Sequence, residues 1–216
     1  MALTFRGVVI KWYGHDSFLL EGGGRRVWVD PYELPEGVPA GDLVLITHDH
    51  FDHFSEADIR RVSSPESALV APFPITIEGI ASQCLPVGEG ATVSGVETRA
   101  VPAYNLDKLK SPGEPYHPKG SERCGWIVNL GGVRIYHAGD TDRIEEMRQI
   151  KCDIALLPVS GTYVMTAAEA EEATQDLGPE VAIPMHYGGI VGSGKDAQHF
   201  KQAASVRVEV LDKEEG

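Results

Sequence analysis

Short apolar stretches flank glycine turns near the start and in the middle of the chain. Three glycines lie between residues 17–21 and 26–30, and two lie between residues 124–130 and 133–137. Glycine readily adopts the positive φ that a tight hairpin turn requires. The pattern therefore predicts two antiparallel β-hairpins, each of which ends close to an aspartate.

Each predicted hairpin is followed by a continuous apolar run and then by a polar, helix-like segment. Residues 42–46 and 153–157 have the unbroken apolar composition of strands that are buried on both faces. A serine begins the first helix, predicted over residues 55–62. A Thr-x-x-Glu capping box begins the second, over residues 166–177, and a Gly-Pro pair ends it.

The second series repeats the first with an offset of about 110 residues. A further apolar strand follows each helix, at residues 67–73 and 180–186. We therefore expect one domain over residues 1–216, built of two similar halves, about 1–100 and 101–216. Repeated hairpins and helical crossovers favour an α/β fold with two mixed β-sheets face to face and helices outside.

Three further segments complete this expectation. Residues 75–83 and 195–205 have the composition of shorter helices. Residues 104–123 are rich in proline, glycine and charge, and are predicted to form a long loop. Such loops in compact domains are usually functional or mobile.

Composition and charge narrow the choice of function. The chain has 216 residues, of which 42% are hydrophobic and 24% charged, as in folded globular proteins. Its 19 Lys and Arg against 32 Asp and Glu give a net charge of −13. Such a charge disfavours nucleic acid and anionic membranes as general partners, although a local basic groove stays open.

Other features of the sequence bear on cellular location, cysteine chemistry and oligomeric state. No apolar run is long enough to span a membrane, and the N-terminus lacks a signal-peptide pattern, so we expect a cytoplasmic protein. The three cysteines are far apart and form no CxxC pair, so neither a thiolate zinc site nor a disulfide framework is expected. The sequence leaves the oligomeric state open, including a homo-oligomer.

The largest cluster of possible metal ligands directly follows the buried run at residues 42–46. In an extended segment, side chains two residues apart point the same way, so His48 and His50 can aim at one ion. Asp52 and His53 can then reach a second point nearby. Imidazole and carboxylate suit Zn²⁺, Mn²⁺ or Fe, and a strand end exposes such ligands. The string therefore predicts a metal site.

The motif His48-x-His50-x-Asp52-His53 resembles the metal motif of the metallo-β-lactamase superfamily. Further segments are similar to its branch of metal-dependent hydrolases that resemble ascorbate-6-phosphate lactonase. These segments are Trp12-Tyr13-Gly14-His15-Asp16-Ser17-Phe18, Val29-Asp30-Pro31, His137-Ala138-Gly139-Asp140-Thr141 and Pro184-Met185-His186-Tyr187-Gly188. They occur in the family's order and span nearly the whole chain.

The resemblance implies an αββα sandwich with a two-metal cleft along one sheet edge. Zinc is the first expectation for the two divalent ions, with manganese or iron as alternatives. The implied ligands are His48 and His50 for the first ion, Asp52, His53 and His186 for the second, and Asp140 as a bridge between them.

One ligand of the first ion is missing from the expected place. The family usually supplies a histidine where this chain has residues 101–105, which contain none. His117 and His137 are the nearest candidates. His117 is favoured because its loop can fold over the cleft, whereas His137 is expected to be either a buried, hydrogen-bonded histidine or a partner of a ligand. If neither binds, one ion can suffice.

Three other residues have two interpretations each. His15 is expected near the cleft, as a ligand or substrate contact, or in a purely structural role. Asp30 can orient a ligand histidine or cap a turn. Tyr163 follows the second buried run at a position equivalent to the metal motif, so it can donate a hydrogen bond to substrate or simply pack.

The expected chemistry is hydrolysis of a small anionic ester, lactone or phosphoester by a metal-bound hydroxide. The resemblance also implies Asp52 as a proton acceptor. Basic residues in or beside the segment 104–123 can supply positive charge for the substrate. Two alternatives stay open: a phosphodiesterase acting on nucleic acid, which would need a basic groove, and a metal- or ligand-binding protein without turnover.

Overall fold

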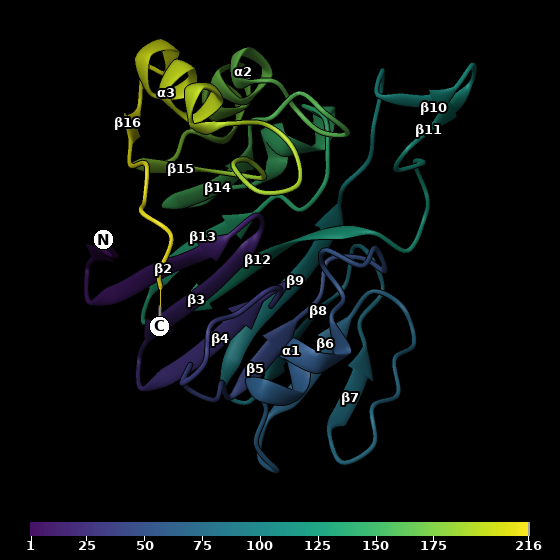
Figure 1. Ribbon diagram of the computed structural model, residues 1–216, viewed down its shortest axis with the longest axis vertical. Helices are drawn as coiled ribbons and strands as arrows, with labels where there is room; N and C mark the ends of the chain where they lie inside the picture. Colours follow the sequence, from purple (N-terminus) through teal and green to yellow (C-terminus); the bar gives the residue numbers. More distant parts are fainter. Residues whose placement is uncertain (216) are drawn as a thin grey trace.

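Two seven-stranded β-sheets dominate the structure, a computed structural model that describes residues 1–215. The strands of the first sheet lie side by side in the order in which they occur along the chain (Figure 1). They are β1 (Leu3–Phe5), β2 (Val8–Gly14), β3 (Ser17–Gly22), β4 (Arg25–Val29), β5 (Leu43–Leu45), β6 (Ala68–Ala71) and β7 (Ala81–Cys84).

The second sheet is built from the rest of the chain, in the spatial order β16-β15-β14-β13-β12-β9-β8. Its strands are β8 (Gly90–Val93), β9 (Val96–Pro102), β12 (Cys124–Leu130), β13 (Val133–His137), β14 (Ile154–Pro158), β15 (Val181–Met185) and β16 (Arg207–Val208). A small hairpin of β10 (Leu109–Ser111) and β11 (Glu114–Pro115) projects from the body of the molecule (Figure 1).

Each large sheet contains one of the predicted hairpins, followed by parallel strands. β3 pairs antiparallel with β4, and β12 pairs antiparallel with β13. The next strands, β5 and β6 in one sheet and β14 and β15 in the other, add in parallel. The predicted α/β fold with two mixed sheets is therefore confirmed.

The helices are the crossovers between the parallel strands. α1 (Glu56–Arg61) joins β5 to β6, and α2 (Ala167–Leu177) joins β14 to β15. Ser55 caps α1, and Thr166 begins α2 with the predicted capping box. α3 (Gly194–Ala203) agrees with the helix predicted over 195–205, and a short 3-10 helix, η1 (Glu145–Gln149), precedes β14.

Burial on both faces of the sheets explains the layered arrangement. In β4, Val27 and Val29 pack into the core between the sheets, while Trp28 faces the opposite way and packs with Ile59 of α1. These side chains are fully buried, as the unbroken apolar runs predict. α2 and α3 cover the outer face of the second sheet (Figure 1). Phe200 of α3 belongs to the hydrophobic core.

Two predicted segments differ from the structure. The expected helix over residues 75–83 is wrong: the chain turns at Gly79, whose φ is +84°, and continues into the exposed edge strand β7. The predicted loop over 104–123 also contains the β10–β11 hairpin, which turns at Gly113. Within residues 1–215, no helix combines the length and the apolar character that crossing a membrane requires.

Candidate metal centre

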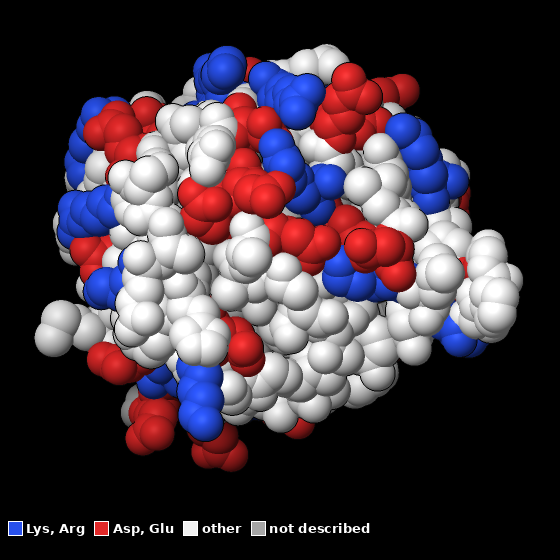
Figure 2. Space-filling model, turned by 90° about the horizontal axis from the view of Figure 1, so that it is seen from above, with Lys and Arg blue, Asp and Glu red and all other residues white. Residues whose placement is uncertain are grey.

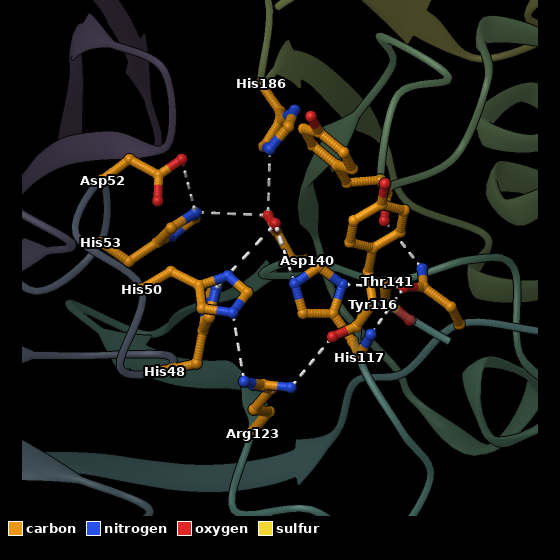
Figure 3. A network of polar contacts seen from close by, with 12 residues as sticks. His48, His50, Asp52, His53, Tyr116, His117, Arg123, Asp140, Thr141 and His186 are labelled. Atoms are coloured by element: carbon orange, nitrogen blue, oxygen red, sulfur yellow. Dashed lines mark hydrogen bonds and ion pairs between the residues drawn. The ribbon is translucent and has the colours of Figure 1, made fainter. Parts of the chain in front are cut away.

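The predicted ligands meet where strands of the two sheets end. The motif from His48 to His53 follows β5, Asp140 follows β13, and His186 follows β15 (Figure 3). Gly139 makes the turn before Asp140 with φ of +62°, and a Cβ there would lie 2.7 Å from a backbone carbonyl oxygen. The carboxyl ends of the buried strands thus deliver side chains to a common point.

One set of ligand atoms gathers on Oδ1 of Asp140. Nε2 of His53 and Nε2 of His186 each lie 3.4 Å from this oxygen. The carboxylate of Asp52 is 4.0 Å from Nε2 of His53. His15 belongs to the same set, since one ligand atom each of His15, Asp52, His53 and His186 lies within 4.8 Å of the others.

A second set gathers on the other oxygen of the same carboxylate. Nε2 of His117 lies 3.4 Å and Nε2 of His48 lies 3.9 Å from Oδ2 of Asp140. Nδ1 of His50 lies 3.1 Å from Nε2 of His48, so these two nitrogens point to one place. Figure 3 shows the five imidazoles arranged around Asp140, which separates the two sets and touches both.

Unpaired polar atoms show that this geometry fits divalent ions. Nε2 of His53, Nε2 of His117 and Oδ1 of Asp140 are buried and have no hydrogen-bond partner. Leaving such atoms unpaired costs about 1–3 kcal/mol each, so native proteins rarely do it without a ligand. Nitrogen and carboxylate oxygen are ligands that Zn²⁺, Mn²⁺ and Fe accept. The residues therefore suit two adjacent divalent ions.

Burial keeps the histidines of the set at Oδ2 neutral. It lowers the pKa of His48 well below its usual range and that of His117 to about 4. Burial also lowers the pKa of His50, and the guanidinium of Arg123 lowers it further. Neutral imidazole is the form that binds a metal.

The set at Oδ1 is dominated by negative charge. Burial works to raise the pKa of Asp140, but the charges of His186 and His53 outweigh it and hold this pKa well below its usual range. Burial works to lower the pKa of His53, but Asp140 and Asp30 raise it to about 10. These carboxylates hold protons on their histidine partners, and a divalent ion can take the place of those protons.

Buried or half-buried polar groups contact Nδ1 of the histidines, on the side of each ring away from Nε2. Oδ2 of Asp30 lies 2.8 Å from Nδ1 of His53, which supports the orienting role for Asp30 over a simple turn cap. Oγ of Ser160 lies 3.0 Å from Nδ1 of His186. Such contacts select the tautomer that leaves Nε2 free for a metal.

Asn105 performs the same task for His117. Its Oδ1 lies 2.9 Å from Nδ1 of His117 and also accepts the backbone N–H of that residue. Neither Asn105 nor Ser160 was predicted from the sequence as a partner of a ligand histidine. Asn105 lies in the segment 101–105 where a histidine was expected, so that segment contributes to the site through an amide.

The structure distinguishes the two candidates for the missing ligand. His117 lies in one of the two sets, whereas His137 lies in neither. His137 is fully buried, with Nε2 2.9 Å from the backbone oxygen of Asp16 and with Nδ1 accepting the N–H of Gly139. It therefore supports the backbone on both sides of the centre.

His15 contacts a predicted ligand directly, whereas Tyr163 contacts Asn105, the partner of His117. Nε2 of His15 lies 3.1 Å from Oδ2 of Asp52. Burial works to raise the pKa of Asp52, but this contact and the charge of His53 together outweigh it and lower that pKa. Tyr163 is 37% exposed, packs edge-on against Tyr116 with ring centroids 4.5 Å apart, and accepts a hydrogen bond from Asn105 through its backbone oxygen.

Comparison with known proteins places this arrangement in a family. A profile described as "Beta-lactamase superfamily domain" matches residues 9–186. A UPF0173 metal-dependent hydrolase of Methanosphaerula palustris is 35% identical over 203 residues, which cover 90% of each protein. This identity extends over most of both chains, well beyond the metal motif.

Solved structures agree. A structure from Parabacteroides distasonis is 30% identical, with a TM-score of 0.81, over 98% of this chain and 99% of that one. Igni18, a metallo hydrolase from the archaeon Ignicoccus hospitalis, is 26% identical, with a TM-score of 0.74, over 96% of both chains. The chain belongs to the metallo-β-lactamase superfamily, among its metal-dependent hydrolases.

Proposed function

We propose that the protein holds two divalent ions and hydrolyses a small anionic ester, lactone or phosphoester. The observation that carries this proposal is the division of the ligands by Asp140, with one set at each of its oxygens. Zinc is the first expectation for the metal, and manganese or iron accept the same ligands.

Divalent ions bound at the two sets would lower the pKa of bound water to about 7 and polarise the electrophile. The residues of the chain hold this arrangement in place. His48, His50 and His117 serve the first position, and Asp52, His53 and His186 serve the second. Asp52 is half-buried beside His15, so its carboxylate is also placed to accept a proton from the attacking water.

Arg123 supports an anionic substrate. Its Nη2 lies 3.1 Å from Nε2 of His50 and 3.3 Å from a carboxylate oxygen of Asp49. An imidazole that binds a metal through Nδ1 carries its proton on Nε2, which cannot accept a hydrogen bond. With His50 as such a ligand, the guanidinium is left with a free donor beside the centre, where it can bind a carboxylate or phosphate.

The other basic residues of this region argue against a nucleic-acid groove. Lys108 pairs with Glu169 at 2.8 Å, and Lys119 pairs with Glu146 at 3.0 Å. Their charges are therefore largely balanced by neighbouring acids. On the face drawn in Figure 2, basic side chains are interspersed with acidic ones. This arrangement favours a small substrate over a phosphodiester strand, whose binding needs several free cations.

A substrate panel on protein of measured metal content tests the proposal. The panel contains small carboxylic esters, lactones, phosphomonoesters and phosphodiesters, each in anionic and neutral versions, and a single-stranded oligonucleotide. We expect turnover of an anionic small molecule that disappears on chelation and returns with added metal. Arg123→Gln should raise KM for the anionic version more than for the neutral one.

Each other outcome contradicts a defined part of the proposal. Cleavage of the oligonucleotide alone would favour the phosphodiesterase. Full metal occupancy without turnover of any compound would favour a binding protein. Equal KM changes for anionic and neutral substrates in Arg123→Gln would remove the anion contact.

A further inference from the structure

Asp16 is a buried carboxylate without a hydrogen-bond partner. It lies in the turn between β2 and β3, and its relative exposure is 0%. Neither of its carboxylate oxygens has a donor within hydrogen-bond distance. A fully buried carboxyl group without a hydrogen-bond partner is unfavourable in a folded protein. A partner for this side chain is therefore to be sought nearby.

The surroundings of Asp16 belong to the metal centre. Its Oδ2 lies 3.8 Å from Nδ1 of His53. One nitrogen or oxygen each of Asp16, His53, Asp140 and His186 lies within 4.8 Å of the others. The carboxyl group of Asp16 therefore lies close to that of Asp140. Two negative charges at this distance repel each other unless a positive charge lies between them.

No neighbouring protein group donates a hydrogen bond to the carboxylate of Asp16. Nδ1 of His53 lies 2.8 Å from Asp30, so its proton is directed to that carboxylate. His137 contacts the backbone oxygen of Asp16 and leaves the side chain free. Neither oxygen of Asp16 has a recorded hydrogen-bond partner, so the side chain lacks one inside the protein.

We propose that Asp16 is an additional ligand of the second metal position and supplies its third carboxylate. This inference rests on the proposed function only in requiring that ions bind. The first position offers three imidazoles and one carboxylate oxygen. The second then offers carboxylates of Asp16, Asp52 and Asp140 with the imidazoles of His53 and His186. Oxygen-rich sites favour Mn²⁺, whereas imidazole-rich sites favour Zn²⁺.

Metal titration of the whole chain tests this assignment. Chelator-treated protein is titrated with Mn²⁺, followed by calorimetry and by the electron paramagnetic resonance of free Mn²⁺, and separately with Zn²⁺. Asp16→Asn keeps the shape and removes the charge. We expect Asp16→Asn to lower the affinity of the second position for Mn²⁺ by at least roughly 10–100-fold. Loss of a residue that only contacts a metal ligand already has an effect of this size. Tight binding of the first Zn²⁺ should be unchanged.

Ser17→Ala is the matched control. Ser17 is the next residue, is also fully buried, and its Oγ also lacks a partner. Its variant should bind Mn²⁺ like the unmodified protein. Asp16→Asn with unmodified Mn²⁺ affinity would overturn the assignment, as would an equal loss in Ser17→Ala.

A crystal structure of the unmodified, Mn²⁺-loaded protein gives a test that does not depend on folding of the variant. A carboxylate oxygen of Asp16 coordinated directly to the ion would support the assignment. An ion whose coordination omits Asp16 would overturn it. If the unmodified protein binds no ion, the proposed function fails as well. If it binds two ions and Asp16 touches neither, only the present inference fails.

Discussion

Asp30 and His53 form a fully buried pair, with Oδ2 of the aspartate 2.8 Å from Nδ1 of the histidine. The same carboxylate accepts two hydrogen bonds from Thr47, from its backbone N–H at 2.8 Å and its hydroxyl at 2.6 Å. One side chain from the end of β4 thus fixes both the start of the metal motif and the imidazole at its end.

The first prediction concerns this pair. Asp30→Asn replaces one accepting oxygen by a donor, so it misorients either Thr47 or His53. We expect a 10–100-fold loss of metal affinity, measured by competition with a chromogenic chelator. Asp107→Asn, on an exposed side chain of the 104–123 segment, is the control and should bind as before. Unchanged affinity in Asp30→Asn would show that the pair does not position the ligand.

Asp140 touches both sets of ligands, so its removal should affect both ions. Asp140→Ala should reduce the metal content measured by mass spectrometry at both positions and lower turnover by more than about 100-fold, beyond the effect of an outer contact. His199→Ala is the histidine control, because His199 is exposed on α3 and belongs to neither set. Normal activity in Asp140→Ala would contradict the bridging role.

The two candidate histidines for the first ion give opposite expectations. His117→Ala should lower the metal content by about one ion per chain, because the first position then keeps two imidazoles. Asn105→Ala should weaken the same position by roughly tenfold, since it removes the contacts that orient His117 but leaves its Nε2 as a ligand atom. His137→Gln should keep full metal content. Loss of metal in the His137 variant with retention in the His117 variant would reverse the assignment.

The sequence predicted the supporting fold because that information is local. The hairpins, the buried strands and the caps of α1 and α2 follow from glycine turns, apolar runs and capping residues that are each readable within about a dozen positions. The helix predicted over 75–83 is wrong because local composition does not decide between helix and strand there. Its apolar residues suit a helix equally well, and only pairing with β6 selects the strand β7.

The metal centre was predictable where its ligands form a compact motif and hidden where they depend on tertiary contacts. His48 to His53 are adjacent in sequence, so their shared direction could be inferred. Asn105 acts because the 104–123 segment folds back and places His117 against it, a contact that no spacing reveals. Asp16 adjoins His15 in sequence, yet its relation to Asp140 arises only from packing of the two sheets.

The last prediction concerns the pH dependence of stability in the chelated protein. The pKa of His53 is about 10 in the folded chain, against 6.5 for an ordinary histidine, because Asp140 and Asp30 outweigh the effect of burial. A raised folded-state pKa stabilises the fold fully below pH 6.5, and this contribution disappears as the pH approaches 10. The metal-free protein should therefore lose on the order of 4 kcal/mol of unfolding free energy across this range.

Metal loading should abolish that loss, because an ion replaces the proton on His53 and binds more tightly as the pH rises. Urea unfolding at pH 6.5 and 9.5, with chelator and with added metal, measures both cases. His53→Gln, which cannot be protonated, should flatten the profile of the chelated protein. A chelated protein that becomes more stable between pH 6.5 and 9.5 would contradict the idea that protons and metal ions compete for the charge of Asp140 and Asp30.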